Sequence, residues 1–266
     1  MKPKFKIAVQ TLCIASLCIA SLLILISSTH IYSQNYTVIL RNHHNSIYTE
    51  EKTTYQIFSS NKTFELPQTP FQTILSQRTT FRGKIITIKS GRAEYNLQHN
   101  LNRYLEDTMF LNLNSPEISN AAKRFNPSDK DILNQIETFV YNHITNKTLG
   151  IPLLPAVNIM RQRSGACTEH TVLAVALLRK NKIPTRAVVG AVLTPQFLGE
   201  NNVFVYHMWA EAYINGRWEL VDATTPGVKH PNRYITFAYH SLRSAMPISV
   251  LGAVGALGDV RITYIR

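Results

Sequence analysis

"GACTEHTVLAVALLRKNKIPTRAVVG", residues 165–190, places one cysteine directly before an apolar run of helical length. We expect a helix from Cys167 to Lys180, followed by a turn at Pro184 and a buried strand, "RAVVGAVL". A thiol at the first position of a helix lies among N–H groups without helical partners, and the helix dipole favours its thiolate. Gly165 would let the backbone turn sharply and a substrate approach. The stretch therefore indicates a reactive cysteine at a helix N-terminus.

Downstream of this helix the sequence changes to the two-residue period of strands. "NVFVYHMWAEAYI" and "RWELVDAT" flank Asn215-Gly216, a pair that supplies the positive φ angles of a type I′ turn. In the register set by a two-residue turn, Trp209 faces Asp222, so His207 and Asp222 are diagonal neighbours on one sheet face. A carboxylate that orients an imidazole is what a base beside a nucleophile requires. The spacing therefore predicts a site made of Cys167, His207 and Asp222.

Upstream, short segments rich in β-branched and aromatic residues precede two further helices. "TTYQIF", "KIITIK" and "AEYNLQ" are predicted strands of a small β-rich region, and helices are predicted after Ser115 and near Ser128. "YITFAY" and "VRITYI" are predicted strands in the tail. Helices followed by strands predict an α+β fold, with helices packed on an antiparallel sheet. We expect an N-terminal segment of residues 1–28, a β-rich region of residues 29–113 and a catalytic domain of residues 114–266.

The N-terminus predicts a membrane anchor. "IAVQTLCIASLCIASLLILI", residues 7–26, carries no charge, follows three lysines and has the length of roughly 20 residues that a spanning helix needs. The lysines favour a cytoplasmic N-terminus, so the remainder of the chain would lie outside. An uncleaved anchor is favoured over a cleaved signal peptide, because the apolar core is long and Ser27-Ser28 is a weak cleavage site. We expect a single-pass membrane protein with an extracytoplasmic catalytic domain.

Composition indicates a folded, basic protein with one thiol outside the anchor. Of 266 residues, 45% are hydrophobic and 17% are charged, which argues against a disordered chain. The formal net charge of +12 would attract anionic envelope polymers. The sequence contains no dense Lys/Arg tract with interleaved aromatic residues, so nucleic-acid binding is not expected. Cys13 and Cys18 fall in the predicted anchor, so Cys167 has no partner for a disulfide within the exported part. Such a thiol is either buried and inert or reactive.

The motifs around Cys167 resemble those of the transglutaminase-like superfamily. A Gly-x-Cys opens a helix that ends in Ala-Leu-Leu-Arg and Ile-Pro-x-Arg, and "HMWAEAYINGRWELVDAT" supplies a His-x-Trp-x-Glu strand and a Trp-x-x-x-Asp strand. The resemblance covers about Pro116 to Thr236, and the Cys-x-Glu-His variant looks most like bacterial membrane-anchored or exported members. Many members have Asp before the cysteine, where this chain has Ala166.

This resemblance implies a papain-like core fold and assigns roles to individual residues. Cys167 would be the nucleophile, His207 the base and Asp222 the orienting acid. Three further residues match motif positions that usually shape the site: Arg186, Trp209 and Glu211.

Other roles for the polar residues near Cys167 were weighed. His170, on the same helix face as Cys167, is a rival base, but we favour a supporting contact because it lacks an acid at strand spacing. A metal site of Cys167, His170 and His207 is disfavoured, since structural zinc usually has paired ligands and no Cys-x-x-Cys occurs. Gln162 or Asn158 could donate to an oxyanion, but nothing in the sequence fixes their geometry, so we favour loop residues. With no nucleotide-binding loop or metal motif, no cofactor is expected.

The predicted reaction is attack of a Cys167 thiolate on an amide carbonyl of a protein or peptide, which gives an acyl-enzyme. Transfer of the acyl group to water would make the enzyme a cysteine peptidase or amidase. Transfer to a lysine would make it a crosslinking protein-glutamine γ-glutamyltransferase. Hydrolysis is favoured because bacterial relatives of this kind look more often hydrolytic. The remaining alternative is a binding module that does not use its site, and the intact set of three residues argues against it.

Overall fold

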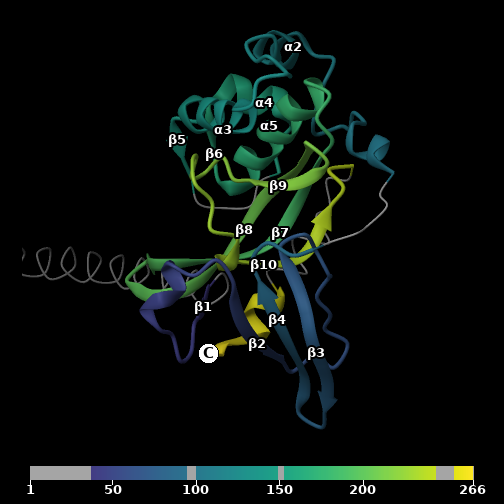
Figure 1. The fold of residues 1–266 in the computed structure, drawn as a ribbon. Coiled ribbons are helices and arrows are strands. Elements are labelled where there is room, and N and C mark those ends of the chain that lie inside the picture. Colours follow the sequence, from purple (N-terminus) through teal and green to yellow (C-terminus); the bar gives the residue numbers. More distant parts are fainter. Residues whose placement is uncertain (1–36, 95–99, 149–152, 244–254, 266) are drawn as a thin grey trace, which may run out of the picture.

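Two antiparallel sheets and a group of helices make up the fold (Figure 1). The computed structural model describes residues 37–94, 100–148, 153–243 and 255–265. The larger sheet contains β1 (Thr37–Ile39), β7 (Thr185–Phe197), β8 (Glu200–Ile214), β9 (Arg217–Val221) and β10 (Tyr234–His240). Its order is β1-β8-β7-β10, with β9 also paired to β8. The smaller sheet has the order β11-β2-β4-β3 and contains β2 (Thr53–Ser59), β3 (Gln72–Thr80), β4 (Gly83–Ser90) and β11 (Arg261–Ile265).

The helices lie together at one end of the long strands β7 and β8, and the smaller sheet lies toward the other end (Figure 1). They are α2 (Pro116–Ala122), α3 (Ile132–His143), α4 (Ala156–Gln162) and α5 (Cys167–Lys180). Helix α5 is central, since every residue from Thr168 to Arg179 is buried and the helix contacts β7, β8 and the other three helices. Further elements are the short 3₁₀ turns η1 (Asn45–Tyr48), η2 (Leu101–Tyr104) and η3 (Pro231–Arg233) and a two-stranded pair of β5 (Asn146–Lys147) with β6 (Ser164–Gly165).

The two local predictions around the site are confirmed. Helix α5 begins at Cys167 and ends at Lys180, as the apolar run predicted. Asn215 and Gly216 have φ angles of 53° and 79°, and β8 pairs with β9 in the predicted register, in which Ile214 faces Arg217. The α+β class with helices packed on an antiparallel sheet is also confirmed.

Upstream, the structure differs from the predicted elements in three places. Strand β3 was not predicted, because most of its residues are exposed and polar and their pairing is decided by β4. Helix α3 begins at Ile132 rather than near Ser128, because the Asp129 carboxylate accepts from the Asp131 N–H and closes a turn first. In "AEYNLQ", Ala93 and Glu94 are not in a strand, and the rest lies outside the described residues.

Strand pairing crosses the expected division at residue 113 in both directions. Strand β1 pairs with β8 in the larger sheet, and β11, near the C-terminus, pairs with β2 in the smaller sheet. Each sheet therefore contains chain from both sides of that position. The predicted anchor, residues 7–26, lies outside the described residues. Within the described ranges, no helix combines the length and hydropathy needed to cross a bilayer.

Buried hydrogen bonds connect the smaller sheet to residues 231–236, which form η3 and the start of β10 in the larger sheet. The Ser90 hydroxyl donates to the Tyr234 carbonyl at 2.5 Å, and the Tyr55 hydroxyl donates to the Asn232 carbonyl at 2.9 Å. The Gln72 amide oxygen accepts from the Thr236 N–H at 2.9 Å. These contacts matter for the site described below because His230, Arg233 and Tyr234 line it.

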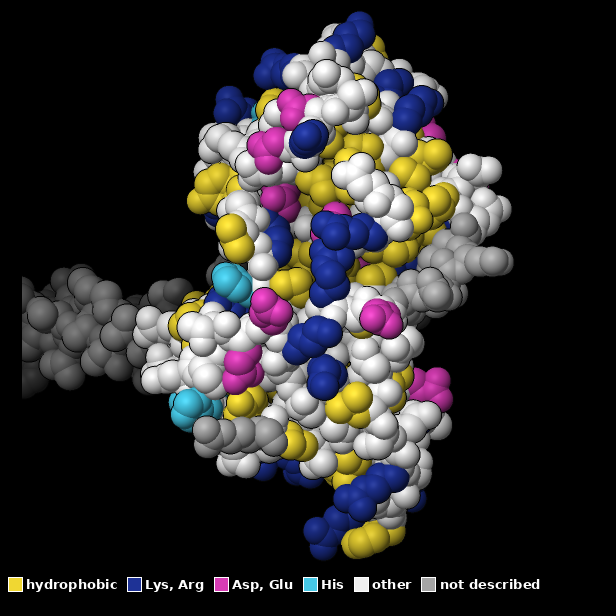
Figure 2. Space-filling model, viewed as in Figure 1, with side chains coloured by type: hydrophobic (Ala, Val, Ile, Leu, Met, Phe, Trp, Pro, Cys, Tyr) yellow, Lys and Arg dark blue, Asp and Glu magenta, His cyan; other side chains and the backbone are white. Residues whose placement is uncertain are grey.

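Positive charge is spread over both parts of the molecule. Figure 2 shows Lys and Arg side chains on the helical part, near the middle of this face and at the tip of the β3–β4 hairpin. At that tip, Phe81 is 82% exposed and lies against the Arg82 guanidinium.

Candidate active site

His207 and Asp222 are in direct contact. His207 lies on β8, Asp222 follows the last residue of β9, and His207 Nε2 is 2.7 Å from Asp222 Oδ2. Both side chains are buried, with residue exposures of 8% and 2%. The diagonal placement that the hairpin register predicted therefore brings the two groups within hydrogen-bonding distance.

Asp222 is held by more than the histidine. Its Oδ1 accepts from the Thr224 N–H at 3.0 Å and from the Thr224 hydroxyl at 2.6 Å, and its Oδ2 also accepts from the Tyr234 hydroxyl at 2.9 Å. Burial disfavours the charged carboxylate, but His207 and these donors outweigh burial and hold the pKa of Asp222 far below its usual range. The carboxylate is thus ionised and fixed in orientation.

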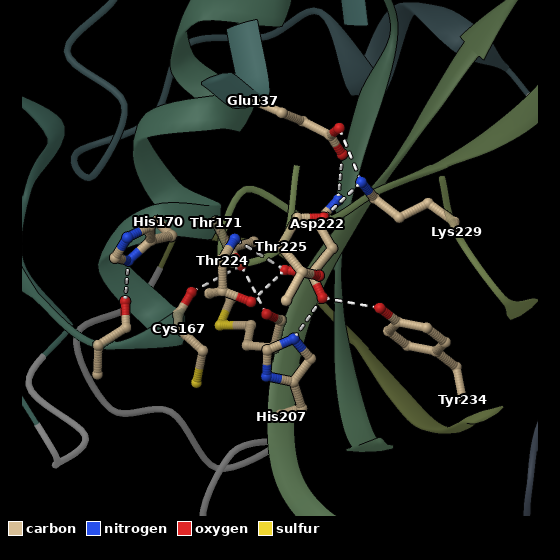
Figure 3. A network of polar contacts seen from close by, with 12 residues as sticks. Glu137, Cys167, His170, Thr171, His207, Asp222, Thr224, Thr225, Lys229 and Tyr234 are labelled. Carbon is tan, nitrogen blue, oxygen red and sulfur yellow. Dashed lines mark hydrogen bonds and ion pairs between the residues drawn. The ribbon is translucent and has the colours of Figure 1, made fainter. Parts of the chain in front are cut away.

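Cys167 lies on the other side of the His207 ring. Figure 3 shows its sulfur, at the start of α5, directed toward the ring nitrogen that does not contact Asp222. The thiol is half-buried. Burial opposes a charged imidazole, but the attraction and hydrogen bond of Asp222, with a smaller contribution from Cys167, raise the pKa of His207 to about 10. This arrangement favours a protonated imidazole beside the sulfur at neutral pH.

A hollow opens on each side of this pair. The Cys167 hollow has a volume of about 320 Å³, and its lining includes Tyr141, Lys147, Ala166, Cys167 and Thr224. The His207 hollow has a volume of about 600 Å³ and includes His207, Asp222 and Thr224. Its lining also includes apolar residues (Val192, Phe197, Val205, Val228), two cationic residues (Lys229, Arg233) and the imidazole of His230. Thr224 lines both hollows, so they adjoin at the site.

Comparison with known proteins assigns the region that contains this site. Residues 117–223 match the family model of the transglutaminase-like superfamily. This part of the chain is therefore similar to members of that superfamily. The match includes Cys167, His207 and Asp222, as the sequence motifs predicted.

Solved structures of low sequence identity also align with the chain. A candidate cysteine protease from Cytophaga hutchinsonii aligns with a TM-score of 0.49 and 16% identity, over 79% of this chain and 83% of the other. The periplasmic domain of TgpA from Pseudomonas aeruginosa, bound to ethylmercury, aligns with a TM-score of 0.48 and 18% identity, over 66% and 73%. Red sea bream transglutaminase aligns with a TM-score of 0.34 and 10% identity, over 79% and 51%. The sequence matches no curated protein.

His170 is engaged away from His207. Its Nδ1 lies 2.6 Å from the Ala166 carbonyl, and its Nε2 lies 2.8 Å from Lys147 Nζ. These contacts identify Nδ1 as the donor and Nε2 as the acceptor of a neutral ring. Burial lowers the pKa of His170 to about 4, and the Lys147 charge adds to the effect of burial. His170 therefore supports the loop before Cys167.

Arg186 and Glu211 form a separate buried ion pair. Arg186 Nη2 and Glu211 Oε2 are 2.6 Å apart, with side-chain exposures of 2% and 0%. The Arg186 guanidinium lies between the rings of Trp218 and Tyr239, at 4.1 and 4.0 Å from their centroids. Neither charged residue lines the Cys167 hollow or the His207 hollow. The pair connects β7 to β8, the strand on which His207 lies.

Trp209 lies next to the site in the core. Its indole is stacked on the His207 ring at 6.1 Å between centroids and packs edge-on against Tyr234 at 5.1 Å. Trp209 is 1% exposed, so it limits how the imidazole can turn without contacting solvent itself.

Gly165 serves a different purpose from the one that the sequence suggested, and Gln162 lies away from the site. A Cβ at Gly165 would lie 2.3 Å from Glu169 Cβ, so close packing, and not a sharp turn, explains the glycine. The space is filled by the Glu169 side chain, whose carboxylate accepts from the Ala166 N–H at 2.8 Å and caps α5. Gln162 is exposed at the end of α4 and does not line either hollow.

Two supports of Asp222 were missed by sequence reasoning, and Figure 3 shows both. Glu137, on α3, accepts from the Asp222 N–H at 2.5 Å and pairs with Lys229 at 2.8 Å. Burial raises the pKa of Glu137 to about 7, although Lys229 opposes the rise. Tyr234 donates to the carboxylate itself. Thr224, two residues after Asp222, was the one support with a local signal, because Asx turns use that spacing.

Proposed function

We propose that this chain is an enzyme that cleaves amide bonds through an acyl-enzyme on Cys167. One observation carries the proposal: His207 bonds to Asp222 through Nε2 at 2.7 Å, and its other ring nitrogen faces the Cys167 sulfur (Figure 3). A nucleophile, a base and an acid that orients the base are the parts needed for acyl transfer to a thiol.

In the first half-reaction, the Cys167 thiolate attacks the amide carbonyl carbon and the protonated His207 stands ready as a general acid. The carbon–sulfur bond forms, the carbon–nitrogen bond breaks, and the His207 proton goes to the departing nitrogen. The backbone N–H groups at the start of α5 are next to Cys167 in the chain, and they are the donors that we propose for the tetrahedral oxyanion.

In the second half-reaction, the neutral His207 takes a proton from water, and the hydroxide attacks the thioester. The carbon–sulfur bond breaks and a carboxylic acid leaves. Asp222 keeps the His207 ring in one tautomer and orientation in both steps. We propose water as the acceptor and a protein or peptide amide as the substrate. An amine in place of water would give crosslinking by the same acyl-enzyme.

Mass spectrometry of the full chain tests this proposal. After incubation with a peptide mixture and rapid acid quench, we expect an acyl adduct on the peptide that contains Cys167. In ¹⁸O-labelled water the released acid should carry the label, whereas an added lysine amide should not compete. Unchanged cleavage by the Cys167→Ala variant would overturn the proposal. His207→Ala should show no adduct while its circular dichroism spectrum stays that of the parent.

We also propose that residues 7–26 anchor the protein in a membrane, with the site outside the cytoplasm. The uncharged run of spanning length after three lysines supports this. An anionic envelope polymer would then be an additional partner of the basic surface. Protease added to intact cells or spheroplasts should degrade the C-terminal region. Full protection of that region would contradict the proposal.

A further inference from the structure

The His207 hollow carries one positive charge that no carboxylate of the described residues pairs with. Asp222 is the one carboxylate of the described residues that lines this hollow. Its oxygens already accept hydrogen bonds from His207, Thr224 and Tyr234. Lys229 also lines the hollow, but its Nζ is paired with Glu137 Oε2 at 2.8 Å.

Arg233 is different. Its Nη2 donates to the Tyr48 carbonyl at 2.8 Å, and its guanidinium lies 4.9 Å from the Tyr48 ring centroid. These contacts orient the group without neutralising it. Its Nε has no hydrogen-bond partner, and no described carboxylate lies within ion-pair distance of the guanidinium. Arg233 is therefore an oriented, unneutralised cation on the wall of a hollow that also contains His207.

The chemistry of the proposed function decides which half of a substrate lies in this hollow. The acyl half stays bonded to Cys167. The other half leaves as an amine and takes its proton from His207, so its nitrogen must lie against the His207 ring. The hollow of about 600 Å³ next to that ring falls within the usual size of ligand sites, roughly 300–1,000 Å³. The leaving half therefore enters the His207 hollow.

We propose that the leaving half of the substrate carries a carboxylate, which Arg233 binds in the His207 hollow. This inference rests on the proposed function. The carboxylate belongs either to an acidic side chain or to the free end of a peptide, because both offer the two oxygens that a guanidinium prefers. The same charge repels a lysine ammonium as acceptor, which favours hydrolysis over crosslinking.

A cleavage assay on the full chain in detergent measures the preference. Peptides that differ only in the residue after the scissile bond, aspartate or asparagine, test an acidic side chain. Peptides that end there with a free carboxylate or an amide test a chain end. We expect at least a tenfold higher kcat/KM for the charged member of one pair, because hydrogen bonds between charged groups are strong and specific.

Variants assign the preference to Arg233. Arg233→Gln should reduce it to about twofold or less, and Arg233→Lys should keep part of it, since charge persists without the planar fork. Arg78→Gln is the matched control, because Arg78 is exposed on β3 in the smaller sheet, and it should leave the ratio unchanged. Equal kcat/KM values within both pairs, or a preference that survives in Arg233→Gln, would overturn the inference.

A second measurement does not need turnover. Aspartyl-alanine amide and asparaginyl-alanine amide resemble the leaving product, and each should slow the alkylation of Cys167 by iodoacetamide when it occupies the hollow. Alanyl-alanine with a free carboxylate tests the chain end. Protection by an acidic member should require about tenfold less peptide than protection by its neutral match, and Arg233→Gln should abolish the difference.

The two proposals fail in different ways. If Cys167→Ala abolishes cleavage but no acidic preference appears, the carboxylate inference falls and the acyl-enzyme stands. If Cys167→Ala cleaves normally, the proposed function falls. If no peptide is cleaved at all, equal protection by the acidic and neutral dipeptides still overturns the inference.

Discussion

Replacing Asp222 by Asn should disable His207 while changing the shape of the site very little. The amide oxygen of Asn can still accept from Thr224, as Asp222 Oδ1 does at 2.6 Å. The amide nitrogen would then face His207 Nε2, where Asp222 Oδ2 lies at 2.7 Å in the parent. An N–H in that position donates to Nε2 and so puts the ring proton on Nδ1, beside the sulfur of Cys167. The ring can no longer accept a proton from the thiol.

The size of the effect follows from the charge that Asp222 supports. Against the opposing effect of burial, Asp222 and, to a smaller extent, Cys167 raise the pKa of His207 from 6.5 to about 10. At 1.36 kcal/mol for each pH unit, this difference corresponds to roughly 5 kcal/mol in favour of the imidazolium. We therefore expect kcat/KM for amide cleavage to fall by about three to four powers of ten at pH 7.

Iodoacetamide labelling of Cys167 at pH 7, followed by mass spectrometry, measures the same loss without a substrate. The rate constant should fall by at least about a hundredfold in Asp222→Asn, because the imidazolium no longer supports the thiolate. Thr224→Val is the matched control. The Thr224→Val substitution removes the hydrogen bond from the Thr224 hydroxyl to Asp222 but keeps the contact between Asp222 and His207. We therefore expect kcat/KM for amide cleavage to fall by about ten- to a hundredfold. A folded Asp222→Asn protein that reacts within tenfold of the parent would refute the reasoning.

Three further predictions follow from the same contacts. His170→Ala should keep measurable cleavage, at about a tenth of the parent rate or more, because His170 contacts the backbone before Cys167 and not His207; a folded but inactive variant would contradict this. Gly165→Ala should destabilise the protein by about 1–3 kcal/mol in thermal unfolding, since the new Cβ would lie 2.3 Å from Glu169 Cβ; an unchanged Tm would rule out close packing as the reason for the glycine. Between pH 6.5 and about 10 the folded state holds a proton on His207 that the unfolded state releases, so the stability contributed by His207 is complete below pH 6.5 and is lost as the pH rises through 10. Urea unfolding of the parent and of His207→Gln should therefore differ most near pH 6 and converge near pH 10, and a constant difference would contradict the raised pKa.

The pairing of His207 with Asp222 could be read from the sequence because it depends on a short-range rule. Asn215-Gly216 permits a two-residue turn, and such a turn determines which residues of β8 and β9 face each other. The start of α5 at Cys167 is equally local, since an apolar run and a small residue before it define the helix end. In both places the residues that decide the geometry lie within about one turn or one hairpin of the residues that they position.

The supports of the site could not be read in the same way. Glu137 reaches the Asp222 N–H across 85 positions of the chain, and Tyr234 reaches the carboxylate from β10. Arg186 matched a motif position, yet its charge points into a buried cage and not into either hollow. No periodicity marks these contacts, because burial and a low local dielectric make a polar group find a partner only after helices and sheets have packed.

The sequence by itself determined that Cys167 begins α5, that His207 pairs with Asp222 and that the fold is α+β, since helix ends, turn chemistry and strand alternation are local properties of the chain. Tertiary structure decided the rest. Pairing of β11 with β2 joins segments about 200 residues apart, and the unneutralised charge of Arg233 in the His207 hollow depends on where Glu137 and Lys229 lie. Whether a charged side chain is paired depends on every residue packed around it, and those residues are brought together only when the chain folds.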